Sequence, residues 1–282
     1  MAELVEISSL PGISKTLLMP LLARAKATRE HSSIFTDTKA LEIVERLRLD
    51  LAEFDQTLHP SHEIFAIARS RALDACVRRF LSEHPRATVV NLGAGLDTAY
   101  QRLDNGFLNW IDVDMTPVVE VRRTLIPETD RNHYVAASVL EGERVKKIKP
   151  RSTEVFFLAC GVLVYFRVAE LRNLFSVISL SFPASEMAFD MQSKMFNFFG
   201  NMRLKRAGME SARFRWGASS GRHAKRLHKN LEVLEENGIF DGLDQSDFSD
   251  RALRRQATII DRFRLWRIVR VRFSDRQPVG DI

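Results

Sequence analysis

Apolar residues recur at helical intervals through the first third of the chain. Their spacing predicts helices over residues 21–29, 37–48 and 61–83. Pro20 is expected to break or kink the first of these helices, because proline cannot donate a backbone hydrogen bond. Strand patterns begin only at Thr88. Residues 1–87 are therefore interpreted as an N-terminal helical lobe or lid.

The pattern changes at Thr88, where short apolar runs start to alternate with helical or loop segments. Five of these runs predict buried strands, over residues 89–92, 108–113, 133–137, 154–159 and 186–190. Helical spacing over residues 117–125 and 168–180 predicts crossover helices between strands. Such alternation is typical of parallel strands. The expected fold class is therefore α/β, with a Rossmann-like, doubly wound, mostly parallel sheet.

The last third of the chain has a mixed pattern. Helices are expected over residues 194–206 and 227–237, with Gly238 ending the second of them. Residues 209–220 have the composition of a loop. Basic and apolar residues alternate over 263–273, which predicts an edge strand half exposed to water.

These predictions give two units, a helical lobe over residues 1–87 and a sheet domain over residues 88–282. A helical substrate lid is expected as an insertion around residues 191–250. The chain has 282 residues, of which 45% are hydrophobic, so it can bury a full core.

Charge and cysteine content indicate in which cellular compartment the protein works and which classes of partner it binds. The net charge is +6, but aromatic residues are not interleaved with the basic runs, so we expect a solvated basic surface and no nucleic-acid partner. Cys76 and Cys160 lack the spacing of metal ligands, and two unpaired thiols favour a reducing compartment. No apolar run approaches the roughly 20 residues that cross a bilayer, and the N-terminus is acidic. We therefore expect a cytoplasmic protein without a metal or a membrane contact.

The candidate chemistry lies in a glycine loop that follows the first predicted strand. Glycines at Gly93 and Gly95 allow a ligand to approach the backbone, and Asp114 ends the next predicted strand, where it can accept hydrogen bonds from ribose hydroxyls. Thr98 stands where a dinucleotide-binding loop has a third glycine, and Asp97 would repel a pyrophosphate at the helix start. S-adenosylmethionine has a ribose and a sulfonium cation but no phosphate. The loop therefore favours a methyltransferase over a dehydrogenase.

Four candidate ligand contacts follow four separate predicted strands. Gly93, Asp114, Ser138 and Cys160 each come directly after a strand. Because the carboxyl ends of parallel strands meet at one edge of the sheet, these residues are expected to share one rim.

Several longer stretches resemble the leucine carboxyl methyltransferase-like family, and the bacterial branch with polyketide O-methyltransferases of the tetracenomycin type is the closer match. The resemblance is carried by Val90–Thr98, Trp110–Asp114, Ala137–Leu140 and Gly161–Phe166, with further similarity at Thr16–Leu18, Ala23–Ala25, Arg69–Asp74 and Arg213–Gly217. It implies a class I methyltransferase fold, S-adenosylmethionine as the methyl donor, and a carboxylate or hydroxyl oxygen as the acceptor.

The resemblance also implies roles for individual residues around the methyl donor. Gly93 and Gly95 would approach its methionine part, Asp114 would bind its ribose, and Arg69 would pair with its carboxylate. Ser138 and Val139 stand where many relatives have an Asp-Leu pair that contacts adenine.

Cys160 departs from the family pattern. Many relatives have a glutamate there, which would face the amino group or the sulfonium of the methyl donor. Either binding of the methyl donor is weaker in this chain, or another residue such as Asp97 supplies the charge. The alternative interpretation is a small buried hydrophobic residue at a strand end.

Residues on the acceptor side are predicted less directly. Arg213 or Arg215 would orient an acceptor carboxylate, and Tyr165 or Trp216 would wall the pocket. Three histidines are candidates to reach the rim, and each is interpreted as a surface residue: His62, His133 and His223. An acceptor carboxylate is already ionised and needs no general base, so the lack of an obvious base favours it.

The sequence thus favours an S-adenosylmethionine-dependent O-methyltransferase that acts, as a monomer or homodimer, on a small-molecule carboxylate or hydroxyl of the polyketide or secondary-metabolite type. Two alternatives stay open, a methyltransferase for the terminal carboxylate of a protein and a protein that binds S-adenosylmethionine with weak or no turnover. A nucleic-acid methyltransferase is disfavoured, because the chain has no Asn/Asp-Pro-Pro-aromatic motif.

Overall fold

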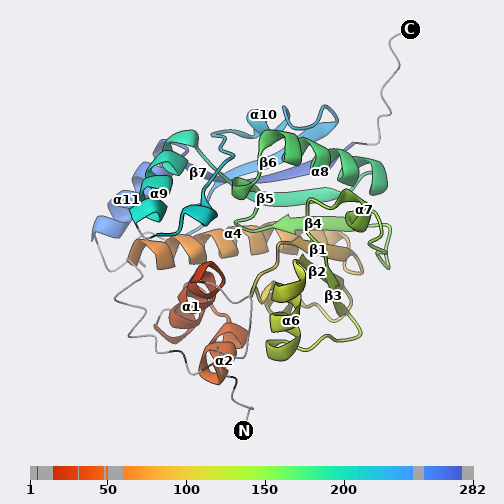
Figure 1. The fold of residues 1–282 in the computed structure, drawn as a ribbon, viewed down its shortest axis with the longest axis horizontal. Coiled ribbons are helices and arrows are strands. Elements are labelled where there is room, and N and C mark those ends of the chain that lie inside the picture. Colours follow the sequence, from red (N-terminus) through yellow and green to blue (C-terminus); the bar gives the residue numbers. More distant parts are fainter. Residues whose placement is uncertain are drawn as a thin grey trace.

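The computed structural model describes residues 5, 15–30, 32–47, 49, 60–206, 208–243 and 251–274. A seven-stranded sheet with the strand order β3-β2-β1-β4-β5-β7-β6 forms its centre (Figure 1). The strands are β1 (Thr88–Leu92), β2 (Asn109–Asp114), β3 (Asn132–Ala136), β4 (Val155–Ala159), β5 (Glu186–Gln192), β6 (Leu231–Gly238) and β7 (Trp266–Phe273). The strands β1 to β5 are parallel to one another, whereas β7 runs antiparallel to both β5 and β6.

Helices cover both faces of the sheet. The longer ones are α1 (Lys15–Glu30), α2 (Thr38–Arg46), α4 (Pro60–Glu83), α6 (Thr116–Leu125), α8 (Val168–Ser181), α9 (Lys194–Arg206) and α11 (Arg251–Arg262). Short helices complete the connections: α5 (Ala99–Leu103), α7 (Gly142–Val145), α10 (Gly221–Ala224) and the 3₁₀ turns Leu163–Tyr165 and Glu210–Ala212. This is the doubly wound, mostly parallel sheet that the alternating pattern predicts.

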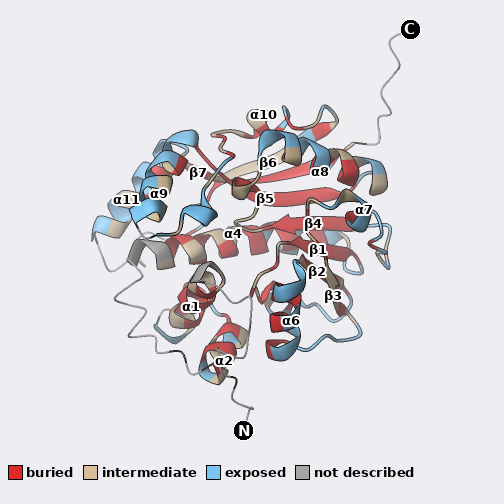
Figure 2. Cartoon of the chain, viewed as in Figure 1, coloured by how far each residue is buried: buried red, intermediate tan, exposed pale blue. Residues whose placement is uncertain are grey.

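The side chains of each strand alternate between two hydrophobic cores, as a pleated strand requires. Val89 and Phe156 pack on one face with the inner side of α4. Val90 and Phe157 pack on the other face with α8. Figure 2 shows the central strands β1, β4 and β5 as buried.

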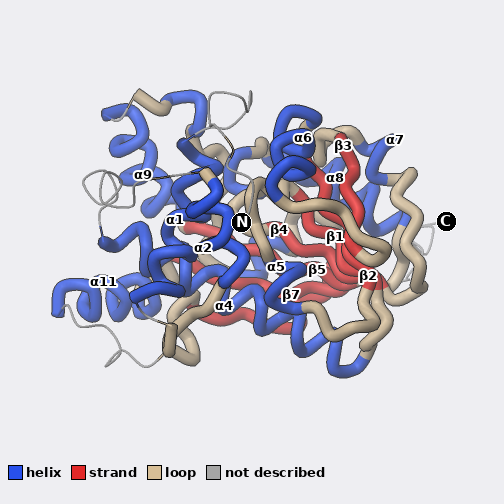
Figure 3. The backbone as a smooth tube through the Cα atoms, turned by 90° about the horizontal axis from the view of Figure 1, so that it is seen from below, coloured by secondary structure: helices blue, strands red, loops and turns tan. Residues whose placement is uncertain are grey.

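The helices α1 and α2 form a third core with α6. Leu21 and Ile43 meet Val121 and Leu125 there, together with Leu96 from the loop after β1. Figure 3 shows α1 and α2 side by side when the molecule is seen from below. The first helices therefore pack directly on the loop that carries the glycines.

The helices predicted in the first third are confirmed, with one correction. Asp37 caps α2 by accepting the N–H of Ala40 at 3.0 Å. The predicted break at Pro20 is wrong, because α1 runs without interruption from Lys15 to Glu30. A proline inside a helix removes one backbone bond, and the buried Leu18, Leu21 and Leu22 on both sides of it hold the helix in place.

The five predicted parallel strands and the helices α6, α8 and α9 are confirmed, but the helix predicted over residues 227–237 is wrong. Most of that segment belongs to β6, which pairs with β7 through a bulge between Val233 and Glu235. Its acidic side chains meet arginines across the strands, for example Glu235 with Arg270 at 2.8 Å. Tertiary pairing of this kind overrides a local helical pattern.

The prediction of an edge strand near the end of the sequence is also wrong, because β7 lies between β5 and β6. Its arginines pair with carboxylates of the neighbouring strands, and among them Arg272 also stays exposed to water. Arg270 donates to Glu186 at 2.6 Å and to Glu235 at 2.8 Å. The alternation of basic and apolar residues therefore belongs to an interior strand, in which an arginine forms ion pairs with carboxylates of both neighbouring strands, β5 and β6.

The division at residue 87 and the lid around residues 191–250 stay predictions. The predicted lid contains α9, α10 and the strand β6, so its described part is not wholly helical. Residues 207 and 244–250 of the predicted lid, and residues 1–4, 6–14, 31, 48 and 50–59 of the predicted lobe, lie outside the described residues. Among the described helices, none is both long enough and apolar enough to cross a membrane.

Candidate functional site

The loop after β1 depends on two glycines. Gly93 has φ +63° and Gly95 has φ +50°, which side chains other than glycine rarely adopt. A Cβ atom on Gly93 would lie 2.6 Å from Cγ2 of Val162, and one on Gly95 would lie 3.0 Å from Cδ2 of Leu17. The loop is therefore held between the turn after β4 and the helix α1, with no room for larger residues.

Asp114 is joined to this loop at the end of β2. Its Oδ2 accepts the N–H of Gly95 at 2.7 Å, and its Oδ1 accepts the N–H of Met115 at 2.7 Å. Burial raises the pKa of the Asp114 carboxyl, whereas the two N–H bonds act in the opposite direction. The structure thus brings together Gly93, Gly95 and Asp114, as the motif predicts.

Arg122 braces the same loop from α6. Its Nη1 donates to the carbonyls of Gly95 and Asp97 at 2.8 Å each, and its Nη2 donates to Asp112 at 2.6 Å. Sequence reasoning missed this residue, because an arginine on an amphipathic helix is expected to face solvent.

Asp97 belongs to a buried network of arginines and carboxylates. Arg102 donates to Asp97 at 3.2 Å, to Asp37 at 2.8 Å and to both oxygens of Asp74. Arg24 on α1 also donates to Asp37, at 2.9 Å. Burial alone would raise the pKa of Asp97, but Arg102 and Arg24 hold it below its usual value. Asp97 is therefore an anion whose charge is balanced within the protein.

A second cluster lies where β4 and β5 end. Cys160 and Gly161 follow β4, Asp190 belongs to β5, and Arg69 reaches the cluster from α4. Asp190 Oδ1 accepts the N–H of Gly161 at 2.5 Å, and its Oδ2 lies 3.7 Å from Nη1 of Arg69. Trp266 from β7 completes the cluster, with its Nε1–H 3.0 Å from Asp190 Oδ2.

Arg69 is enclosed in this cluster, and its side chain is only 14% exposed. Burial alone would lower the pKa of its guanidinium, but the neighbouring carboxylate of Asp190 helps to raise it above its usual value. Its Nε is buried and has no hydrogen-bond partner among the described residues. A buried N–H without a partner is costly, so the group can gain from an external acceptor.

Cys160 is half-buried, and burial raises the pKa of its thiol to about 12. The thiol is therefore neutral at physiological pH. It cannot supply the negative charge that the family glutamate would bring to this position.

Ser138 and Val139 follow β3, next to the end of β2. Ala136 of β3 lies opposite Asp114 in the sheet, and the Ser138 hydroxyl accepts the N–H of Leu140 at 3.3 Å. Val139 is buried in the core. The four predicted contacts after β1, β2, β3 and β4 thus share one edge of the sheet.

The segment 213–218 lies against the turn after β4. The N–H groups of Arg215 and Trp216 both donate to the carbonyl of Val164, at 2.7 and 3.1 Å. Tyr165 in that turn packs against Phe214, with ring centroids 5.7 Å apart. The structure therefore brings the predicted acceptor residues beside the Cys160 cluster.

Two asparagines of α9 hold this segment in place, and sequence reasoning missed both. Asn201 accepts the N–H of Phe214 at 2.8 Å and donates to its carbonyl at 3.0 Å. Asn197 donates to the carbonyl of Trp216 at 2.6 Å. The asparagines recur one helical turn apart, which is the signal that could have indicated a shared partner.

The individual side chains of the segment differ in exposure. Arg213 and Arg215 are exposed, whereas Trp216 is buried against Phe189, with ring centroids 6.2 Å apart. Trp216 therefore contributes to the core beneath the segment.

The three histidines are distributed over separate elements. His133 lies beside Arg151, and His223 lies beside Ser220. The side chain of His62 lies outside the described residues.

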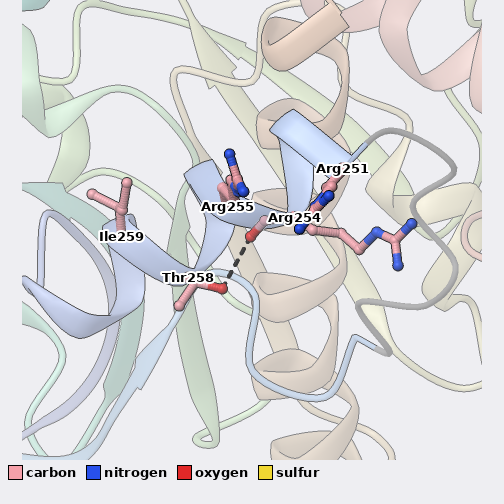
Figure 4. A pocket seen from close by; sticks show the side chains of 5 residues that line it. All are labelled: Arg251, Arg254, Arg255, Thr258 and Ile259. Atoms are coloured by element: carbon pink, nitrogen blue, oxygen red, sulfur yellow. Dashed lines mark hydrogen bonds between the residues drawn. The ribbon is translucent and has the colours of Figure 1, made fainter.

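A basic hollow of about 420 Å³ lies on the outer surface of α11 (Figure 4). It is lined by Arg251, Arg254, Arg255, Thr258 and Ile259, and the Thr258 hydroxyl donates to the carbonyl of Arg254 at 3.0 Å. None of the residues at the ends of the parallel strands lines it. The candidate site is therefore the rim of the sheet and not this hollow.

Comparison with known proteins identifies the family. Residues 17–179 match the sequence profile of the leucine carboxyl methyltransferase family. The chain is 30% identical over 238 residues to the tetracenomycin polyketide synthesis O-methyltransferase TcmP of Streptomyces glaucescens, covering 84% of this chain and 86% of that protein. The chain belongs to the leucine carboxyl methyltransferase family. It is also 34% identical over 137 residues to the S-adenosyl-L-methionine-dependent methyltransferase dpfgK of Gibberella zeae, covering 45% of this chain and 46% of that protein.

Solved structures agree with the fold of this family. A candidate methyltransferase from Thermobifida fusca superposes with a TM-score of 0.57 at 15% sequence identity, covering 89% of this chain and 94% of that one. A protein of the DUF574 family from Streptomyces avermitilis gives a TM-score of 0.55 at 15% identity, covering 89% and 96%. The α/β class I methyltransferase fold is confirmed.

As a member of the leucine carboxyl methyltransferase family, the chain is a methyltransferase that uses S-adenosylmethionine. The rim fits this cofactor in two respects. At Gly93 and Gly95 the absence of a Cβ atom leaves space beside the backbone that any larger residue would fill. The buried Nε of Arg69 also has no acceptor within the described chain, which suits a carboxylate-bearing ligand.

Proposed function

We propose that the chain is an O-methyltransferase that transfers the methyl group of S-adenosylmethionine to an oxygen of a small molecule of the polyketide or secondary-metabolite type. The observation that carries the proposal is the bond between Asp114 and the Gly95 N–H at the carboxyl end of the sheet. This bond holds a carboxylate beside the glycine loop, and a carboxylate in that position is the group that binds a ribose in folds of this kind.

Each part of the methyl donor has a suitable partner on the rim. Asp114 would accept the ribose hydroxyls, and Gly93 and Gly95 would allow close approach of the methionine part. Arg69 would bind its carboxylate. Ser138 and Val139 would contact the adenine, with a hydroxyl where a charged acceptor would otherwise stand.

The sulfonium of the methyl donor supplies an activated methyl group when it is bound. The chain has to orient the acceptor oxygen and exclude water. Leu17 and Val162 cover the glycine loop and would exclude water from that side. The residues 213–218 and the helical segments around them would form the acceptor side, with Arg213 or Arg215 available to orient an anion.

The titratable groups near the rim favour an acceptor that is already ionised. Burial raises the pKa of both the Cys160 thiol and the Tyr165 hydroxyl, so neither is a base at neutral pH. A carboxylate acceptor needs no base, whereas a phenol has a pKa near 10 and benefits from one. A small-molecule carboxylate is therefore the favoured acceptor, with a hydroxyl as the second choice.

Isothermal titration with S-adenosylmethionine tests the proposed cofactor site. Asp114→Ala is expected to weaken binding by at least about tenfold, because the ribose loses a charged acceptor. Glu120→Ala is the matched control, because Glu120 is exposed on the neighbouring helix α6. Equal binding by the wild type and Asp114→Ala would contradict the assignment.

Mass spectrometry with isotope-labelled methyl donor then tests the acceptor. The panel contains small carboxylic acids, phenols and a peptide with a free terminal carboxylate. Methylation of a small acid or phenol supports the proposal, and methylation of the peptide alone supports a protein carboxyl methyltransferase. Binding of the methyl donor without any methylation supports a binding protein, for which the neutral Cys160 and Ser138 are the structural argument.

A further inference from the structure

Asp190 connects three separate elements around one buried carboxylate. It lies in β5 and is only 3% exposed. Its Oδ1 accepts the N–H of Gly161 at 2.5 Å, and its Oδ2 accepts the Nε1–H of Trp266 at 3.0 Å. Buried carboxylates are stable when they are paired and hydrogen-bonded. Asp190 satisfies this condition with the turn after β4, with β7 and with Arg69 of α4.

Arg69 is confined on several sides by the same residues. Its guanidinium carbon lies 5.7 Å from the centroid of the Trp266 ring. A Cβ atom on Gly161 would lie 2.5 Å from Nη1 of Arg69, so the glycine leaves just enough space for the guanidinium. The position of Arg69 is therefore determined by the residues that Asp190 holds.

The contact between the two charges leaves the N–H groups of Arg69 available. Nη1 and Asp190 Oδ2 are 3.7 Å apart, which is an ion pair but longer than a hydrogen bond. The Nε of Arg69 is buried without a partner in the described part of the chain. A guanidinium has five donors, and a second carboxylate can bind to it in a bidentate manner.

No other anion in this cluster takes the place of Asp190. Cys160 lies beside Arg69, but its thiol is neutral because burial raises its pKa to about 12. Asp97 is bonded to Arg102 instead. Among the described residues, Asp190 is the one carboxylate with an ion pair to Arg69.

We propose that Asp190 is a positioning residue that holds the Arg69 guanidinium in place to bind the carboxylate of the methyl donor's methionine part. Asp190 does not touch the ligand. It fixes Arg69 at charge-pair distance and leaves the N–H groups of Arg69 for the ligand. The inference rests on the proposed function, because it requires S-adenosylmethionine or its product to bind at this rim.

Two ligands that differ only in the amino-acid end test the inference. S-adenosylhomocysteine carries the carboxylate, whereas 5′-methylthioadenosine has the same adenosine and a thioether sulfur but no carboxylate. The dissociation constants of both are measured for the wild type and for Asp190→Asn, Arg69→Met and Glu186→Gln. The ratio of the two constants reports the contact with the amino-acid end alone.

Asp190→Asn is expected to weaken S-adenosylhomocysteine binding by about tenfold, which is about 1.4 kcal/mol. It should change 5′-methylthioadenosine binding by less than about threefold. Arg69→Met should give at least the same selective loss, because it removes the guanidinium itself. The double variant should lose no more than Arg69→Met alone, since Asp190 acts through Arg69.

Glu186→Gln is the control for a merely structural role of a buried carboxylate on β5. Glu186 lies on the same strand as Asp190 and is 3% exposed, and it accepts a hydrogen bond from Arg270 at 2.6 Å, so Glu186→Gln weakens a buried ion pair away from Arg69. It should lower the melting temperature and leave the ratio of the two constants unchanged. An equal loss of both ligands in Asp190→Asn would overturn the inference, as would a normal ratio in that variant. Failure of the wild type to bind either ligand would instead contradict the proposed function.

Discussion

The backbone N–H of Gly95 donates to Oδ2 of Asp114, so the loop after β1 and the end of β2 hold each other. Met115 holds the other carboxylate oxygen. An ionised carboxylate offers about four lone-pair positions, so acceptor capacity remains after both bonds are made. The orientation of Asp114 is therefore set by the protein before a ligand binds, which reduces the ordering that binding requires.

Gly93→Ala is expected to weaken binding of S-adenosylhomocysteine by about tenfold or more and to lower the free energy of unfolding by about 1–3 kcal/mol. The new Cβ atom would lie 2.6 Å from Val162, at a φ of +63° that alanine rarely adopts. Titration calorimetry and urea denaturation measure the two effects. Gly106→Ala is the matched control, because Gly106 has φ +84° but no atom within 4 Å of a new Cβ. A loss of binding as large in Gly106→Ala would show that backbone strain, and not the contact with Val162, is responsible.

Asp261→Asn is expected to raise the free energy of unfolding at pH 7.5 by about 1–2 kcal/mol, and this gain should vanish near pH 4. Burial and the nearby Asp241 raise the pKa of Asp261 to about 6. Because the pKa of an unfolded aspartate is about 3.9, the contribution of Asp261 to wild-type stability falls as the pH rises from 4 to 6 and then stays level. Urea denaturation at several pH values measures the effect. A gain that is the same at pH 4 and pH 7.5 would refute the titration of Asp261, and the exposed Asp130→Asn should show no change.

Arg102→Lys is expected to lower the free energy of unfolding by about 3 kcal/mol. Arg102 donates to Asp37, Asp74 and Asp97 together, and a lysine ammonium cannot reproduce this planar set of bonds. Thermal unfolding measures the loss. Arg255→Lys, at an exposed position on α11, should be nearly neutral. Equal melting temperatures for both variants would mean that the network adds little to stability.

Asn201→Ala is expected to raise the KM for the acceptor by about fivefold to tenfold, with little change in the affinity for the methyl donor. Asn201 holds Phe214 through both its N–H and its carbonyl, so the variant frees the segment beside Tyr165. Steady-state kinetics with any acceptor found in the panel measures the effect, and the exposed Asn173→Ala is the control. A change in the affinity for the methyl donor without a change in KM for the acceptor would contradict the prediction, because it would show that the segment acts on the methyl donor.

The parts of the site that could be predicted from sequence are those set by local geometry. Gly93 and Asp114 follow strands with clear apolar runs, and parallel strands bring their carboxyl ends to one edge. The structure places them together for that reason. Arg69 could be predicted as well, but only through family resemblance, because an arginine on an amphipathic helix carries no local signal.

The parts that could not be predicted depend on contacts between distant segments. Asp190 meets Trp266 from a strand 76 positions later in the chain. Arg102 donates a hydrogen bond to Asp37, which lies 65 residues earlier in the chain. The strand β6 has apolar spacing that also fits a helix, and only its pairing with β7 decides between the two. In each case, partners that are remote in sequence determine the outcome, and a local pattern does not include them.

The interior position of β7 has a consequence for how the protein is made. β7 follows all other strands of the sheet in the chain, yet it lies between β5 and β6. When residues up to about 260 have emerged from the ribosome, β5 therefore has an unpaired edge and β6 lacks its pairing partner. Unpaired edges of this kind favour aggregation. Completion of the sheet must wait for residues 266–273, so ribosome-bound chains shortened before that strand should depend on chaperones for solubility.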